Sequence, residues 1–188
     1  GFEAVVAYDP DAQVRRDTAA AYPSLELVDS PAQAIEAPGV TATYIACPPL
    51  HHAAHALAGF EAGHAVWCEK PLGVDIPGSE QLVAAAQASG QVNIVNFSLA
   101  SAVATAEIEA LLGDGALGDI VGVDFRAHFA RWPRQWQENA ASWLALRFEG
   151  GFTREVVSHW IYLTERLFGS LALESADCRY PGGEACET

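Results

Sequence analysis

The stretch TYIACPPLHHAAHALAGFEAGHAVWCEKP, residues 43–71, contains one complete unit of the expected fold. Thr43–Cys47 is apolar and β-prone, and Pro48-Pro49 ends the strand that it predicts. His51–Ala62 predicts a helix that ends at the following glycine, since glycine readily adopts the left-handed conformation that closes helices. A second apolar strand follows over Ala65–Cys68. Strand, helix and strand of these lengths are typical of a βαβ unit with two parallel strands.

The same alternation continues on both sides of this unit. Further strands are expected over Val5–Asp9, Leu25–Val28 and Val92–Val95, and further helices over Asp11–Ala21, Pro31–Glu36 and Ile76–Ser89. Right-handed crossovers make a doubly wound α/β sandwich the simplest topology for such a series. We therefore expect residues 1–96 to form a Rossmann-type dinucleotide-binding domain with a parallel sheet.

After Asn96 the pattern changes. Helices are expected over Thr105–Leu112 and Thr153–Phe168, and strands over Ile120–Phe129 and Leu171–Tyr180. The first of these strands alternates apolar and polar residues, as antiparallel strands with one solvated face do. Residues 97–188 thus predict a second, α+β domain with an open antiparallel sheet that is incomplete.

Composition excludes several classes of partner. The chain has 188 residues with 24 acidic and 10 basic side chains, a formal net charge of −14. Such a negative field repels nucleic acid and anionic membrane surfaces. No apolar run reaches the roughly 18 residues that a spanning helix needs. The four cysteines have no Cys-x-x-Cys spacing, so we expect a reducing, cytoplasmic environment.

Lys70 is the only lysine, whereas nine positions carry arginine. It stands between Glu69 and Pro71 at the carboxyl end of a predicted strand. Ligands of open α/β sheets bind at those strand ends, and lysine is a compact donor whose proton responds to its surroundings. A surface ion pair with Glu69 is the alternative; position and rarity favour a functional lysine.

Asp9 ends what would be the second strand of a nucleotide-binding half. An acid there can accept both hydroxyls of an adenosine ribose, which favours NAD over NADP. Asp9-Pro10 is also typical of a simple turn. Arg15 and Arg16 follow within two helical turns and keep NADP open.

Histidines gather at the start of the helix in the quoted stretch. His51 and His55 are four residues apart and could share a metal, but no third ligand stands at a zinc-site spacing, so no metal is expected. His52 is a candidate hydrogen-bond donor where a cofactor would pass. A satisfied structural histidine has the same sequence signature.

Glu155 and His159 are also four residues apart, which places them on one helical face. They follow Gly150-Gly151, which would allow the backbone to approach a ligand closely. A carboxylate beside an imidazole is a usable general acid–base arrangement near neutral pH, although an ordinary helical pair has the same spacing.

The Trp- and Arg-rich residues 130–145 are a candidate for the substrate side, through Arg131, Trp132 or Arg134. A packed loop with solvated arginines is the alternative.

These pieces together resemble one known family. The run Ile45–His52, the tripeptide Glu69-Lys70-Pro71, and Gly150-Gly151 followed by Glu155 and His159 are similar to the Gfo/Idh/MocA family, which includes glucose–fructose oxidoreductase and inositol dehydrogenase. The resemblance implies an N-terminal Rossmann domain and an α/β domain whose open sheet supports substrate and oligomer contacts. It also implies a homo-oligomer, a dimer or tetramer, that transfers hydride between NAD or NADP and a sugar, polyol or related hydroxy compound.

The resemblance also implies residue roles. Lys70 would hydrogen-bond the reacting oxygen, His159 would donate or accept its proton, and Glu155 would support the pair. Pro71 would follow a cis peptide bond. The residues implied to line the cofactor are Asp9, Cys47, Pro48, His52, Glu69, Lys70 and Asn96.

Some positions depart from the family pattern. Its first strand, Gly-rich turn and first helix have no counterpart before Gly1, and the chain contains no methionine, so we expect part of a longer protein. Glu155 and Tyr162 stand where the family often has aspartate. Two alternatives to a dehydrogenase therefore stay open: a non-catalytic dinucleotide- or sugar-binding regulator of the same fold, and a fragment unable to bind cofactor.

Overall fold

The structure is a computed structural model that describes residues 1–187, except for the side chains of residues 139–141. The last residue of the expected second domain, Thr188, lies outside this description. The chain forms two compact units. The first contains residues 1–47 and 51–95, and the second contains residues 48–50 together with the chain from Asn96 onward.

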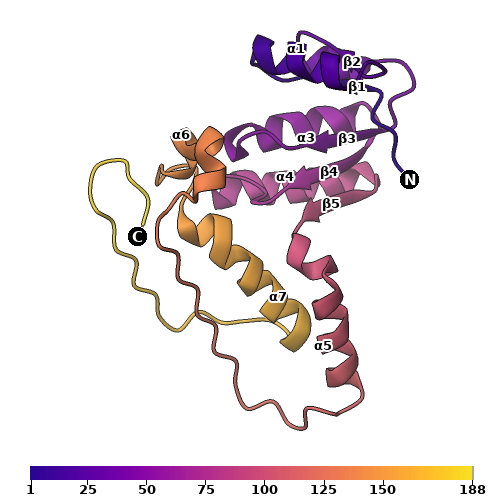
Figure 1. Ribbon diagram of the computed structural model, residues 1–188. Coiled ribbons are helices and arrows are strands. Elements are labelled where there is room, and N and C mark those ends of the chain that lie inside the picture. The colour runs from indigo at the N-terminus through magenta and orange to yellow at the C-terminus, as the bar shows by residue number, and fades with distance from the viewer. Residues whose placement is uncertain (188) are drawn as a thin grey trace. The chain divides into compact units, whose positions relative to one another are not determined.

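A three-stranded sheet organises the first unit. Its strands are β3 (Ala42–Ile45), β4 (Ala65–Glu69) and β5 (Asn93–Asn96), in the order β3-β4-β5. β3 and β4 are parallel, with Ala42 opposite Ala65 and Ile45 opposite Cys68. The helices α3 (His52–Glu61) and α4 (Ile76–Ser89) run beside this sheet (Figure 1). The expected βαβ unit and parallel α/β class are confirmed.

The N-terminal part of this unit contains a second, two-stranded parallel sheet. Its elements are β1 (Val6–Ala7), α1 (Ala12–Ala21), β2 (Glu26–Leu27) and α2 (Pro31–Glu36). Asp11 begins α1 by accepting the backbone N–H groups of Gln13 and Val14. Ser30 does the same for α2 through the N–H of Gln33. These side chains satisfy donors that have no partner within the helix, so each helix begins where its capping residue stands.

The core lies between the three-stranded sheet and its two helices. It contains the buried side chains of Ile45, Ala56, Val66, Cys68 and Leu82. Burying a large apolar side chain such as Ile, Val or Leu contributes about 1.5–3 kcal/mol. Helix α3 approaches the sheet closely at Gly59, where an added Cβ would lie 3.1 Å from Val66 Cγ2. This close approach explains a glycine inside a helix.

The named elements of the second unit are helices and helical turns, joined by long segments without regular secondary structure. Besides the short turn η1 (Pro49–His51), its elements are η2 (Ser98–Ser101), α5 (Val103–Gly113), η3 (Gln135–Ala140), α6 (Ala141–Leu144), the π-helical turn η4 (Thr153–Val157) and α7 (Ser158–Phe168). The helix expected over residues 153–168 therefore begins as one π-helical turn. None of the described helices combines the length and apolar character needed to cross a bilayer.

The two strands expected in this unit do not form. Residues 120–129 and 171–180 are extended in Figure 1 but belong to no sheet, and the described residues supply no ladder to either segment. Alternation predicts two faces, but a strand also needs a partner backbone for its hydrogen bonds. Phe125 instead stacks on Trp160 of α7, with ring centroids 3.9 Å apart. Val121 remains fully exposed.

Candidate functional site

The chain leaves β3 and β4 at the same edge of the sheet. Their parallel register, with Ile45 opposite Cys68, brings the residues after each strand to that edge. Cys47 follows β3, while Glu69 ends β4 and Lys70 comes next. Lys70 is half-buried, and the Lys70–Pro71 peptide bond is cis, as the family resemblance implies.

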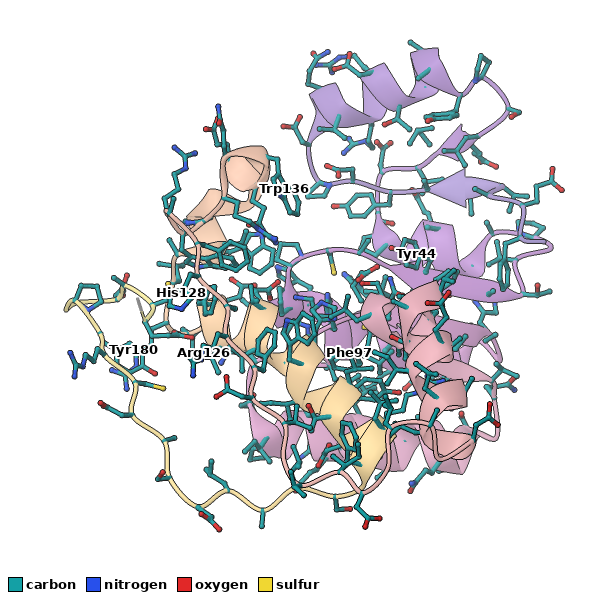
Figure 2. The ribbon with its side chains drawn as sticks, turned by 60° about the horizontal axis from the view of Figure 1, so that its bottom comes forward. Tyr44, Phe97, Arg126, His128, Trp136 and Tyr180 are labelled. Atoms are coloured by element: carbon teal, nitrogen blue, oxygen red, sulfur yellow. The ribbon has the colours of Figure 1, made fainter. Side chains whose placement is uncertain are left out.

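Glu69 is held by a residue that the sequence analysis missed. The hydroxyl of Tyr44, on β3 and labelled in Figure 2, donates to Glu69 Oε1 at 2.6 Å. Partial burial, followed by this hydrogen bond and the negative charge of Glu69, raises the pKa of Tyr44 to about 12. Tyr44 also meets Trp67 edge-on, with centroids 5.2 Å apart. The phenol therefore stays protonated near neutral pH and orients the carboxylate of Glu69, the residue before Lys70.

Burial shifts the pKa of two further groups in the first unit, a thiol and an imidazole. Burial, with smaller contributions from Cys47 and Glu69, raises the pKa of Cys68 to about 12, so its sulfur is a thiol. Burial and the neighbouring histidines lower the pKa of His55. The described residues contain no group of three His, Cys, Asp or Glu side chains arranged around a metal ion.

His52 lies inside the first unit with 1% of its surface exposed. Its Nε2 is 2.8 Å from the carbonyl oxygen of Cys47, and its Nδ1 is 2.8 Å from that of Pro71. The ring thus joins the segments that follow β3 and β4.

The strand expected to end at Asp9 is shorter than predicted: β1 ends at Ala7, and Asp9 lies two residues beyond it. β1 belongs to the separate two-stranded sheet of the first unit. Its Oδ1 accepts the backbone N–H of Asp11 at 2.8 Å, which makes a local turn. Arg15 donates to the carbonyl oxygen of Asp9 at 2.5 Å and to Asp29 Oδ1 at 3.2 Å. One carboxylate oxygen of Asp9 therefore serves the local turn that the sequence analysis gave as the alternative, and Arg15 is engaged with other groups.

The second unit holds the other candidate residues. Glu155 is 9% exposed within the π-helical turn η4, and π-helical turns occur frequently at functional sites. His159 lies one residue into α7, where its ring meets that of Phe97 edge-on, with centroids 5.6 Å apart. Phe97 in turn stacks on Tyr162. Asn96 ends β5 immediately before Phe97, and Figure 2 labels this phenylalanine.

The glycine pair before this segment serves packing within the chain. A Cβ on Gly150 would overlap the backbone of Leu144. Gly151 has φ +107°, and its Cβ would lie 2.7 Å from a carboxylate oxygen of Glu187. The close approach expected here is therefore to the protein's own atoms.

Several side chains of the Trp- and Arg-rich segment contact one another. The guanidinium of Arg134 lies 4.5 Å from the ring centre of Trp136 and 5.1 Å from that of Phe129. Arg131 pairs with Glu138 at 3.0 Å, and Trp132 Nε1 donates to the carbonyl of Leu144. Trp136, labelled in Figure 2, is 74% exposed. This arrangement favours the packed loop over the substrate-side alternative.

A Gly-x-Gly-x-x-Gly spacing does occur, as GDGALG at residues 113–118. It begins at Gly113, the last residue of the helix α5, whereas the dinucleotide-binding fingerprint follows a strand and opens a helix. Gly115 and Gly118 have positive φ values that suit turns at a helix end. This spacing is therefore a helix-end feature.

Comparison with known proteins places the chain in a family. Residues 1–97 match the family model GFO_IDH_MocA, described as an oxidoreductase family with an NAD-binding Rossmann fold. Inositol 2-dehydrogenase 4 of Saccharopolyspora erythraea is 34% identical over 119 residues, which is 63% of this chain and 35% of that protein. Levoglucosan dehydrogenase of Pseudarthrobacter phenanthrenivorans is 28% identical over 147 residues, 76% of this chain and 36% of that protein.

A solved structure supports the same fold. The WlbA dehydrogenase of Bordetella pertussis, solved with NADH and UDP-GlcNAcA, superposes with a TM-score of 0.76 at 23% identity. The match covers 88% of this chain and 47% of that one. The chain thus spans about a third of the length of the two curated relatives above, which it matches over 35% and 36% of their lengths. Because the family model matches residues 1–97, more than half of the chain, and the structure has the parallel strands of that fold, the chain belongs to the Gfo/Idh/MocA oxidoreductase family, whose model describes an NAD-binding Rossmann fold.

Proposed function

We propose that this protein is an NAD-dependent dehydrogenase that transfers hydride between the cofactor and a hydroxyl-bearing carbon of a sugar or polyol. Family membership supports the oxidoreductase class. Two relatives are named for inositol and levoglucosan, which supports a carbohydrate-like substrate. The observation that carries the proposal is the only lysine of the chain, placed at the carboxyl end of β4 beside an oriented carboxylate.

The cofactor would bind along the ends of the parallel strands. The residues proposed to line it are Asp9, Cys47, Pro48, Glu69, Lys70 and Asn96. The strand-end carboxylate of Asp9 fits ribose hydroxyls, because a carboxylate accepts two hydrogen bonds. Arg15 is engaged with carbonyl oxygens and Asp29, which supports NAD rather than a 2′-phosphorylated cofactor. When bound, the nicotinamide accepts or supplies the hydride.

Side chains of the protein would bind the reacting oxygen of the substrate and transfer its proton. The ammonium group of Lys70 would hydrogen-bond the reacting oxygen and stabilise negative charge that develops there. The imidazole of His159 would take the hydroxyl proton during oxidation and return it during reduction. Glu155, largely buried one helical turn earlier, would support His159.

The test is a Lys70→Ala variant of the full-length protein, assayed with NAD and a panel of polyols and sugars. Loss of an acid–base or electrostatic group at a reacting oxygen lowers kcat by about 100-fold or more. The matched control is Arg126→Ala, which removes an exposed cation of the second unit that pairs with the equally exposed Asp124. Unchanged turnover in Lys70→Ala would exclude the assigned role.

Cofactor binding is measured separately. NADH fluorescence titration of the 188-residue chain tests whether these residues retain cofactor binding, and saturable binding would exclude the inactive-fragment alternative. Tight NADH binding by the full-length protein without turnover on any member of the panel would instead indicate a non-catalytic regulator.

A further inference from the structure

His52 is far more deeply buried than Lys70, the candidate catalytic residue nearby in the first unit. It lies in the first turn of α3 and is 1% exposed, whereas Lys70 is only half-buried. Both ring nitrogens are 2.8 Å from main-chain carbonyl oxygens. Turning the ring toward a cofactor or substrate would break an N–H···O=C contact to a part-buried carbonyl, and such a hydrogen bond contributes about 0.5–1.5 kcal/mol.

The two carbonyl groups belong to different segments of the candidate site. Cys47 lies two residues beyond β3, and Pro71 lies two residues beyond β4. The two strands are neighbours in the sheet, with Ile45 opposite Cys68. The imidazole therefore joins the chain after one strand to the chain after the next, and its second contact is on the residue that follows Lys70.

Which of the two carbonyl oxygens accepts a hydrogen bond depends on which ring nitrogen of His52 carries a hydrogen. Carbonyl oxygens only accept, so each contact needs an N–H on the ring. A neutral ring carries one N–H and donates to one of the two carbonyls, whereas a doubly protonated ring donates to both. With a hydrogen on Nδ1, the ring donates to the carbonyl oxygen of Pro71, and it donates to that of Cys47 only when Nε2 also carries a hydrogen.

We infer that His52 is a positioning residue that holds Lys70 through its hydrogen bond to the carbonyl oxygen of Pro71. The inference rests on the proposed function for the catalytic role of Lys70, but the placement of Lys70 is measurable without turnover. It also changes the role expected for His52 from contact with the cofactor to fixing the segment that carries the lysine.

Two substitutions separate the two contacts of the ring. The amide nitrogen of asparagine reaches the position of Nδ1, and that of glutamine reaches the position of Nε2. His52→Asn therefore keeps the donor to Pro71, while His52→Gln keeps the donor to Cys47. Both variants lose the ring, so they share the loss of packing. His51→Asn, the same substitution at the adjacent exposed histidine, is the control.

The first measurement follows Lys70 directly. Because the 188-residue chain has one lysine, reductive ¹³C-methylation labels only Lys70 and the N-terminal amine, and a Lys70→Arg chain identifies the N-terminal signal. We expect His52→Asn and His51→Asn to keep the parent Lys70 resonance. We expect His52→Gln to shift or broaden it. Equal changes in His52→Asn and His52→Gln, including equal unfolding, would overturn the inference.

The second measurement uses steady-state kinetics of the full-length protein. Misplacing a catalytic group by about 1 Å can cost 100-fold in rate, so His52→Gln should lower kcat by about 10- to 100-fold. His52→Asn should stay within about threefold of the parent, since it keeps the donor to Pro71. The KM for NAD should change by less than about threefold in both variants. A fall in NAD affinity with unchanged kcat would overturn the positioning role and favour direct contact with the cofactor.

The two measurements distinguish the two proposals. If the parent binds NADH but turns over no substrate, the proposed function fails, while the Lys70 resonance still decides whether His52 positions the lysine. If the parent is active and the resonance of His52→Gln equals that of the parent, the positioning inference fails and the proposed function stands.

Discussion

The ring of Phe97 stacks on the ring of Tyr162, with centroids 4.3 Å apart and planes inclined by 8°. Phe97 also meets the imidazole of His159 edge-on, at an interplanar angle of 88°. Tyr162 is three residues beyond His159 on α7, so one phenylalanine is held between two residues of the same helix. The arrangement restricts the rotation of the imidazole that we propose to handle the proton.

Removing this stack should impair catalysis through His159. Tyr162→Leu removes the ring, whereas Tyr162→Phe keeps it and loses only the hydroxyl. An aromatic pair contributes about 0.5–1.5 kcal/mol, so we expect kcat to fall about three- to tenfold in Tyr162→Leu and to change less than twofold in Tyr162→Phe. Steady-state kinetics check this, with Ile161→Leu, at an exposed neighbouring position of α7, as the control. Equal kcat values in the Leu and Phe variants would contradict the role of the stack.

Asp9 provides a test of cofactor preference. Asp9→Asn keeps an oxygen that can accept the N–H of Asp11, so the local turn should persist, but it removes the negative charge. A hydrogen bond to a charged group contributes about 1.5–3 kcal/mol, so the ratio of kcat/KM for NAD over NADP should fall by about tenfold or more. Asp17→Asn on α1 is the control. An unchanged ratio would show that Asp9 serves only the turn.

Gly150 should tolerate no side chain. A Cβ there would overlap backbone atoms of Leu144, which cannot move aside as a side chain would. We expect Gly150→Ala to lower the free energy of unfolding by about 1–3 kcal/mol, measured by urea denaturation followed by circular dichroism. Gly122→Ala, where an added Cβ meets nothing within 4 Å, should change it by less than about 0.5 kcal/mol. Similar losses in both variants would contradict this packing account.

Glu187 should make stability depend on pH. Burial alone would raise the pKa of this carboxyl, but hydrogen bonds from Thr153 and the charge of Arg154 lower it below the ordinary 4.5. The backbone N–H of Thr153, the first residue of the π-helical turn, donates to Glu187 Oε1 at 2.6 Å. A depressed pKa stabilises the fold above pH 4.5, and this stability is lost as the pH falls through the lower pKa of the folded state.

The check is a pair of unfolding titrations between about pH 2.5 and 7, a range that brackets the ordinary carboxyl pKa of 4.5. Glu187→Gln should lower the free energy of unfolding at pH 7 by about 1 kcal/mol, since an uncharged amide oxygen accepts more weakly. The difference in the free energy of unfolding between Glu187→Gln and the parent should become smaller as the pH falls. Glu184→Gln, an exposed neighbour, should follow the parent. A difference that grows as the pH falls would show that another group is responsible.

Local patterns predicted the first unit well. The run from β3 to β4 was expected from alternating strand and helix residues, and Asp11, Ser30 and Gly90 mark helix ends as their types suggest. These features depend on neighbours within a few positions, so the sequence displays them directly.

The prediction of antiparallel strands over residues 120–129 and 171–180 was wrong. Their alternation describes which side chains share a face, but it contains no information about a pairing partner. Similarly, the Tyr44–Glu69 hydrogen bond joins residues 25 positions apart, and no local signal indicates it. Knowledge of the register, which sets Tyr44 opposite Trp67, would have revealed it.

By itself, the sequence determined the acidic character of the protein, its parallel α/β beginning and the position of its one lysine at a strand end. Only the tertiary structure decided that His52 is enclosed between two carbonyl groups, that Phe97 lies between His159 and Tyr162, and that Gly150 accommodates the backbone of Leu144. Strands, helices and caps follow from short-range propensity and hydrogen bonding, which are properties of adjacent residues. Contacts between distant residues depend on how those elements pack, because packing decides which groups lose water and which find partners.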